Sequence, residues 1–148
     1  MGNNPDKYPS IWDCHGTRLM LEMLIIGVLI NSAYIPIISN PDVKHVTERA
    51  GYADVYRWDD GQMIMAHNYL SGALFYDVDS VTVFYAGGET KEFEVKQQTV
   101  VQPQDWTSTI MEYSDDATIT LATCYPLDAA GGGSVLLVEL AEAMQDER

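Results

Sequence analysis

Thr120-Leu121-Ala122-Thr123-Cys124 is the stretch from which the fold and the chemistry are best predicted. It closes a run, residues 118–123, in which threonines alternate with aliphatic side chains, a pattern typical of a β-strand with one buried face. His67 stands far upstream, after another apolar run at residues 62–66. A cysteine is a nucleophile only as the thiolate, and a nearby imidazolium favours that form. Cys124 and His67 are therefore a candidate nucleophile pair.

Strand-like patterning extends over most of the remaining chain, and no long helical period competes with it. The predicted strands are residues 19–30, 33–38, 62–66, 80–85, 92–101, 118–123 and 135–140. Residues 86–89 join two of these runs in a predicted hairpin, and Pro36 marks the second run as an edge strand or a strand end. About eight strand segments in one small domain predict a mainly β fold, a closed β-barrel.

One short helix is predicted within residues 42–52. Positions 43, 46 and 50 are apolar at helical spacing, Asn40 is a candidate N-cap, and Gly51 would end the helix. The predicted fold class is therefore a β-barrel with one or two short helices.

Length and composition favour a single domain. The chain has 148 residues, of which 47% are apolar, which is enough for a hydrophobic core that is stable without cross-links.

Acidic side chains outnumber basic ones by 22 to 8, and the formal charge of −14 argues against nucleic acid as a partner. Acidity of this size favours solubility, as in a salty or extracellular setting. Cys14 and Cys124 could form one disulfide with each other, but two cysteines without repeated spacing make neither a disulfide framework nor a zinc site.

Three segments are predicted along the chain. Residues 1–17 are polar and turn-rich and form a predicted flexible leader, residues 18–142 form the barrel domain, and residues 143–148 form a polar C-terminal tail. The most apolar run, residues 19–30, contains Glu22 and Gly27 and is shorter than the ~20 residues that span a bilayer. Neither a membrane anchor nor a signal peptide is visible in the chain.

Other groups of residues are predicted to be structural. Cys14 and His15 are neighbours whose side chains point apart in an extended chain, so we expect no metal site there. Three aspartate pairs are interpreted as solvated turns rather than calcium ligands, at positions 59 and 60, 77 and 79, and 115 and 116. No metal or cofactor is predicted. Trp58, Tyr69 and Trp106 are candidates either for lining a peptide groove or for packing.

Several segments resemble the sortases, cysteine transpeptidases of the Gram-positive cell surface. The family's Thr-Leu-x-Thr-Cys signature is intact at residues 120–124. Four further segments are similar to the family and occur in the same order: Ile26-Gly27-Val28, Met63-Ile64-Met65-Ala66-His67, Ala73-Leu74-Phe75 and Val100-Val101-Gln102-Pro103. The resemblance covers residues 18–140 and implies the sortase β-barrel.

The resemblance also implies an activity. Cys124 would attack a carbonyl within a peptide sorting signal of the Leu-Pro-x-Thr-Gly type, and the thioacyl intermediate would pass to an amine acceptor. His67 would act as the general acid that protonates the leaving amine. The residues implied in substrate binding are Thr123, Ser134, Arg57 and Asn68. The expected location is extracellular or at the cell surface.

The sequence departs from the family pattern shortly after the cysteine. The family places an arginine at the start of the next strand, whereas this chain reads Gly131-Gly132-Gly133-Ser134-Val135. No arginine or lysine occurs between Lys96 and Arg148. Loss of one oxyanion donor typically costs ~10²–10³ in turnover.

Several consequences of this departure are open from the sequence. Arg57 or Arg49 could replace the guanidinium, or Ser134 and the amides of the glycine loop could donate hydrogen bonds instead. Alternatively the protein is a catalytically impaired barrel that binds a peptide or serves as a structural module. A cysteine hydrolase would differ only in passing the acyl group to water.

Overall fold

The computed structural model describes residues 24–41, 45–58, 61–113, 118–125 and 133–143. The predicted leader, residues 144–148 of the predicted tail, and Cys14 with His15 lie outside the described residues. The predicted strand at residues 19–30 is described from Leu24 on and is confirmed from Ile25.

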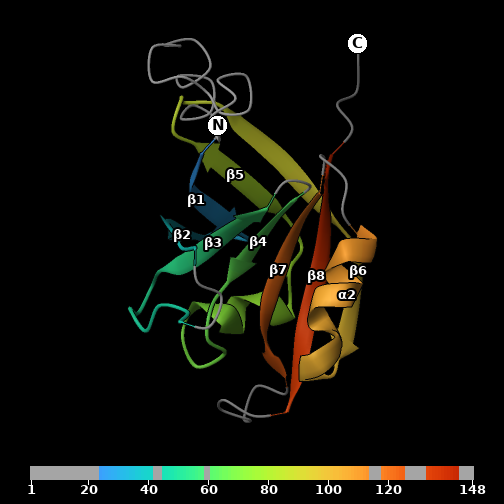
Figure 1. Ribbon diagram of the computed structural model, residues 1–148. Helices are drawn as coiled ribbons and strands as arrows, with labels where there is room; N and C mark the ends of the chain where they lie inside the picture. Colours follow the sequence, from blue (N-terminus) through green and yellow to red (C-terminus); the bar gives the residue numbers. More distant parts are fainter. Residues whose placement is uncertain (1–23, 42–44, 59–60, 114–117, 126–132, 144–148) are drawn as a thin grey trace, which may run out of the picture.

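Eight strands close into a barrel (Figure 1), which confirms the predicted fold class. Their order around the barrel is β1-β2-β3-β4-β7-β8-β6-β5. Neighbouring strands are antiparallel except for the parallel pairs β2–β3 and β4–β7. The strands are β1 (Ile25–Ile30), β2 (Ala33–Ser39), β3 (Ala53–Trp58), β4 (Gly61–Met65), β5 (Val81–Tyr85), β6 (Thr90–Val101), β7 (Thr118–Tyr125) and β8 (Ser134–Glu142).

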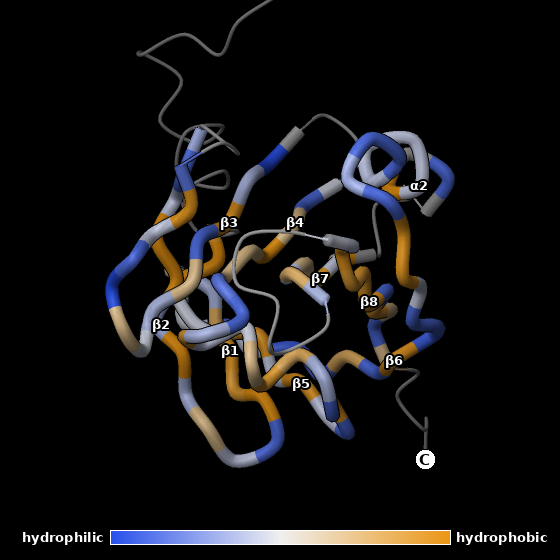
Figure 2. Tube along the Cα trace, turned by 90° about the horizontal axis from the view of Figure 1, so that it is seen from below, coloured by the Kyte–Doolittle hydropathy of each residue, from blue (hydrophilic) through white to orange (hydrophobic). Residues whose placement is uncertain are grey.

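Apolar side chains pack on both faces of the barrel wall. The inner faces of the strands form the main core, which contains fully buried Val28, Ile64 and Leu121. A second cluster lies on the outer face of β4, β7 and β8, with Met63, Ala122 and Leu137 at its centre. Figure 2 shows the strands arranged as a ring, with hydrophobic segments on β1, β5 and β8. The outer cluster gives β7 an apolar face on each side.

Three short helical segments accompany the strands in the part of the chain that the structure describes. The 3₁₀ segment η1 (Ser71–Tyr76) follows β4, and η2 (Pro103–Asp105) leads into the helix α2 (Trp106–Tyr113). Ile110 and Trp106 of α2 join the outer cluster over β8. The helix was not anticipated from the sequence, because only its apolar positions facing β8 distinguish it from a polar connection.

The helix predicted within residues 42–52 is wrong for the part that the structure describes. Residues 45–52 form no helix, because polar side chains take their backbone groups: Asn40 Nδ2 donates to His45 O at 2.9 Å, and Asp54 Oδ2 accepts from Thr47 N at 2.7 Å. The strand β3 begins directly afterwards and was missed, because its buried Asp54 interrupts the apolar pattern.

The strand β2 is not an edge, which corrects that prediction, since the barrel is closed. Pro36 pairs with Gly27 of β1, while pairing with β3 begins only at Ile37. Proline is therefore tolerated because its missing N–H falls before the ladder with β3. The predicted hairpin of β5 and β6 is confirmed.

Burial raises the pKa of the Tyr85 phenol to about 12, and Glu142 and Glu89 act in the same direction, while Arg57 lowers it. The unfolded chain ionises this phenol near its ordinary value of 10.0, so it loses the proton first as pH rises. The contribution of Tyr85 to stability is therefore complete below pH ~10 and is lost toward pH ~12.

We predict that Tyr85→Phe flattens the alkaline loss of stability, measured as the urea midpoint between about pH 9 and 12. Tyr34→Phe is the matched control, because Tyr34 is 51% exposed. Equal alkaline losses in the wild type and Tyr85→Phe would contradict the assignment.

Candidate active site

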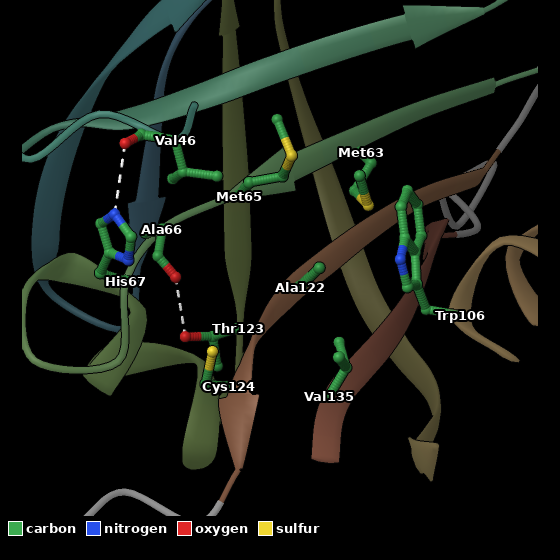
Figure 3. Close-up of a pocket in the computed structure, with 10 residues that line it drawn as sticks. All are labelled: Val46, Met63, Met65, Ala66, His67, Trp106, Ala122, Thr123, Cys124 and Val135. Carbon is green, nitrogen blue, oxygen red and sulfur yellow. Dashed lines mark hydrogen bonds between the residues drawn. The ribbon is translucent and has the colours of Figure 1, made fainter. Parts of the chain in front are cut away.

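The parallel pairing of β4 and β7 brings His67 and Cys124 to the same end of the barrel. Met65, the last residue of β4, pairs with Ala122, and β7 continues three residues further to Tyr125. His67 follows the end of β4, and Cys124 is the penultimate residue of β7. Figure 3 shows both side chains on one side of the pocket. The structure therefore brings together the two residues that the sequence separates.

The two side chains line a pocket of about 220 Å³ on the outer face of the barrel wall. The pocket floor consists of apolar side chains from β4, β7 and β8, and Trp106 of α2 and Val46 stand on opposite sides (Figure 3). The lining residues are Val46, Met63, Met65, Ala66, His67, Trp106, Ala122, Thr123, Cys124 and Val135. Such a pocket suits an uncharged, largely apolar ligand segment.

The His67 ring is held on one edge and one face. Its Nε2 lies 3.2 Å from the carbonyl oxygen of Val46, and Tyr69 stacks on the ring with centroids 4.9 Å apart. Because a carbonyl oxygen only accepts, Nε2 carries the hydrogen. Proton exchange is therefore left to Nδ1, which points to the Cys124 side in Figure 3. Among interactions between described residues, none joins the Cys124 sulfur to this ring.

Two side-chain hydroxyls end the parallel ladder beside the cysteine. The last ladder bond runs from Ala66 N to Ala122 O at 3.3 Å. One residue further, Thr123 Oγ1 donates to Ala66 O at 2.7 Å. The Tyr76 hydroxyl donates to Cys124 O, which points to the same side as Ala122 O. These bonds fix the backbone at Cys124 after its partner strand has turned away.

Glycine at position 72 permits the turn after His67. The carbonyl oxygen of His67 accepts from Leu70 N and from Gly72 N, each at 3.0 Å. A Cβ on Gly72 would overlap Thr123 Oγ1, Ala66 O and His67 O. The start of η1 is thus packed against both strands that carry the candidate pair.

Val135 occupies the position across the sheet from Cys124. The two residues pair in the antiparallel β7–β8 ladder, and both line the pocket. Ala122 O points to β4, so Ala122, and Cys124 two residues on, form non-hydrogen-bonded pairs with β8, in which Cα atoms approach to about 4.5 Å. The start of β8, where the family resemblance places a guanidinium, therefore presents an aliphatic side chain to the cysteine.

The residues expected to bind substrate lie at different places. Thr123 lines the pocket, but its hydroxyl is already bonded to Ala66. Ser134 begins β8 opposite Tyr125, beside the cysteine pair. Asn68 is 1% exposed and does not line the pocket.

The two arginines considered as replacements are not part of the pocket. Arg57 pairs with Gln62 at the start of β4, about 16 Å of extended strand before His67, and its charge acts on Tyr85 at that opposite end. The guanidinium of Arg49 lies 4.0 Å from the centroid of the Tyr52 ring. The structure therefore brings neither guanidinium into the pocket.

The aromatic candidates divide in a similar way. Trp106 lines the pocket and Tyr69 stacks on His67, while the side chain of Trp58 lies outside the described residues.

The turn at residues 77–79 is held by Asn31, which donates to Asp77 O and accepts from Asp79 N, each at 2.8 Å. Within the described ranges no group of His, Cys, Asp and Glu side chains has the arrangement of a metal site.

Sequence reasoning missed the contributions of Val46 and Tyr76. Val46 acts through its backbone carbonyl, which every residue type carries, so no sequence signal marks it. Tyr76 reaches Cys124 over 48 positions in the chain, and only the closed barrel makes them neighbours.

A closed barrel with a cysteine and a histidine at the ends of two parallel strands defines the class: a β-barrel protein with a thiol–imidazole pocket. The sortase domain family matches residues 32–141. The chain belongs to the sortase family. In the part of the chain that the structure describes, none of the helices has the length and apolar character needed to cross a bilayer.

Solved sortase structures share the fold. A lid mutant of sortase A from Corynebacterium diphtheriae is 24% identical with a TM-score of 0.63, covering 84% of this chain and 72% of its own. A lid mutant of sortase C1 from Streptococcus agalactiae is 18% identical with a TM-score of 0.61, covering 86% and 72%. Clostridium perfringens sortase C with its C-terminal cell wall sorting motif is 21% identical with a TM-score of 0.58, covering 84% and 73%. No curated protein matches the chain.

We predict that Gly72→Ala destabilises the protein by about 1–3 kcal/mol, because the added methyl group overlaps the Thr123 hydroxyl and the backbone carbonyl oxygens of Ala66 and His67. It should also change the rate at which a thiol reagent modifies Cys124, measured by intact mass. Gly88→Ala is the control: it is strained by a φ of +94° but has no neighbour within 4 Å. A Gly72→Ala protein with wild-type stability and labelling would refute the packing argument.

Proposed function

We propose that this protein is a sortase-type cysteine transpeptidase that cleaves a peptide sorting signal and transfers the acyl part to an amine. The observation that carries the proposal is the placement of Cys124 and His67 in one pocket at the ends of parallel strands. Membership of the sortase family supports it. The similarity to the structure of Clostridium perfringens sortase C with the C-terminal cell wall sorting motif supports a peptide of that class as the substrate.

In the first step the Cys124 thiolate attacks the carbonyl carbon of the scissile peptide bond. A sulfur–carbon bond forms, and the electron pair of the carbonyl moves to its oxygen. When the oxygen reforms the carbonyl, the carbon–nitrogen bond breaks and the leaving nitrogen takes a proton from His67. Nδ1 is the atom for this transfer, because Nε2 is engaged with Val46 O. The products are a thioester on Cys124 and a free amine.

In the second step an acceptor amine attacks the thioester carbon. His67, now neutral, takes the proton from the attacking nitrogen through Nδ1. Collapse of the intermediate breaks the sulfur–carbon bond and restores the Cys124 thiolate, leaving a new amide. If water replaces the amine, the same steps release a carboxylic acid, and product analysis with and without added amine distinguishes transfer from hydrolysis. We place this activity at the cell surface, where the family generally acts.

A second candidate function is peptide binding without turnover. Val135 favours it, because an aliphatic side chain faces Cys124 where the family resemblance calls for an oxyanion-stabilising arginine. Neither Arg49 nor Arg57 lines the pocket. Ser134 and neighbouring amides would then be the remaining donors to a substrate carbonyl. Under the first proposal, the same substitution is expected to lower turnover below that of arginine-containing sortases.

We predict that sorting-motif peptides of the Leu-Pro-x-Thr-Gly type form a thioacyl adduct on Cys124, detected by intact mass in a Cys14→Ala background. Cys124→Ala should abolish the adduct. His67→Ala should slow its formation by ~10²–10⁴, the usual contribution of a positioned general acid. His45→Ala is the control, since His45 does not line the pocket. Full acyl transfer by Cys124→Ala would overturn the proposal, and peptide binding without any adduct would establish the second candidate.

We predict that Val135→Arg raises acyl transfer by up to ~10², because it returns a donor to the position across from Cys124. The measurement is the rate of product formation with a sorting-motif peptide and an added amine. Val135→Met is the matched control, a long side chain without charge. Equal rates for both variants would show that a guanidinium at position 135 does not reach the reacting carbonyl.

A further inference from the structure

One peptide group connects His67 to a buried carboxylate. The carbonyl oxygen of Val46 accepts from His67 Nε2 at 3.2 Å. The N–H of Thr47, which belongs to the same peptide group, donates to Asp54 Oδ2 at 2.7 Å. The hydrogen bonds therefore run in one line from the imidazole, across the Val46–Thr47 peptide, to the carboxylate.

Asp54 is built into the wall that carries the site. It is 1% exposed, lies on β3, and pairs with Met65, two residues before His67. Its Oδ2 also accepts from Asn40 Nδ2 at 2.8 Å. The Asn40 amide donates to His45 O as well, at 2.9 Å. A buried carboxylate with these donors fixes the segment that presents the Val46 carbonyl to the histidine.

We infer that Asp54 is a positioning residue for His67 and acts through the Val46–Thr47 peptide. A carboxylate that accepts from the peptide N–H polarises the group and makes its carbonyl a stronger acceptor. The stronger acceptor holds hydrogen on Nε2 and keeps Nδ1 available on the side of Cys124. The inference rests on the proposed function for its role in catalysis, but the hydrogen-bond relay itself does not.

The other contact of the ring does not select a nitrogen. Tyr69 stacks on the imidazole with an interplanar angle of 19° and is 55% exposed, so it constrains the plane of the ring but not which nitrogen bears hydrogen. The nitrogen that carries hydrogen is therefore selected by Val46 O, and hence by Asp54, which anchors the Val46–Thr47 peptide. Asp54 thus has a role in the site although it does not line the pocket.

The test is the His67 Nε2–H resonance in ¹⁵N-labelled protein carrying Cys124→Ala, which removes turnover from the readout. Asp54→Ala should release the peptide and speed solvent exchange of this ring N–H about 10- to 100-fold, the usual effect of losing a charged hydrogen bond. Asp54→Asn keeps an oxygen acceptor for Thr47 and Asn40 but loses the charge. It should retain the resonance and move it upfield, because the carbonyl is less polarised.

Glu139→Gln is the matched control. Glu139 is also a buried carboxylate, 5% exposed, and its Oε2 accepts from Gln97 Nε2 at 2.6 Å. It does not line the pocket, so the His67 resonance should be unchanged. Exchange within about twofold of the wild type in Asp54→Ala would overturn the inference. If Asp54→Ala fails to fold, an unshifted resonance in Asp54→Asn overturns it instead. Both outcomes are independent of whether the protein turns over a sorting peptide.

Discussion

The parallel ladder between β4 and β7 is the constraint on which the site depends. Because these strands run in the same direction in register from Gln62–Ile119 to Met65–Ala122, both reach the same end of the barrel. A histidine after one strand and a cysteine at the end of the other then share a pocket. An antiparallel pairing would have put them at opposite ends, with the same two residues in the sequence and no common site.

The ladder is stabilised where it stops. Backbone pairing ends at Ala66 and Ala122, and the hydroxyls of Thr123 and Tyr76 supply the next hydrogen bonds. Gly72 allows η1 to approach this junction closely. A strand end is ordinarily a place where the backbone frays, yet here the carbonyl of the candidate nucleophile is bonded. Thr123, the threonine next to the cysteine in the sortase signature, therefore stabilises the end of the strand as well as lining the pocket.

The pocket is apolar for a protein of this charge. The chain carries a formal charge of −14, but the pocket is lined by aliphatic, methionine and tryptophan side chains with one histidine, one threonine and one cysteine. With Val135 across from Cys124, the candidate nucleophile has an aliphatic partner in the facing strand. The charged group connected to this site is the Asp54 carboxylate, which lies outside the pocket and is linked to His67 through the Val46–Thr47 peptide.

The sequence by itself determined the strands with clear period-2 patterning, the closed mainly β fold and the two candidate site residues, Cys124 and His67, at strand ends. It also identified the region, Ser134 and Val135, where the family pattern breaks. It failed at residues 45–58, because Asp54 is polar yet buried and local spacing there imitates a helix. Only the tertiary structure decided that β4 and β7 are parallel neighbours and that a backbone carbonyl holds His67. It also decided that Arg57 lies near Tyr85, at the end of the barrel opposite the pocket. Periodicity reports which face of a segment is buried, whereas register, strand partner and backbone contacts are set by pairing between residues distant in the chain.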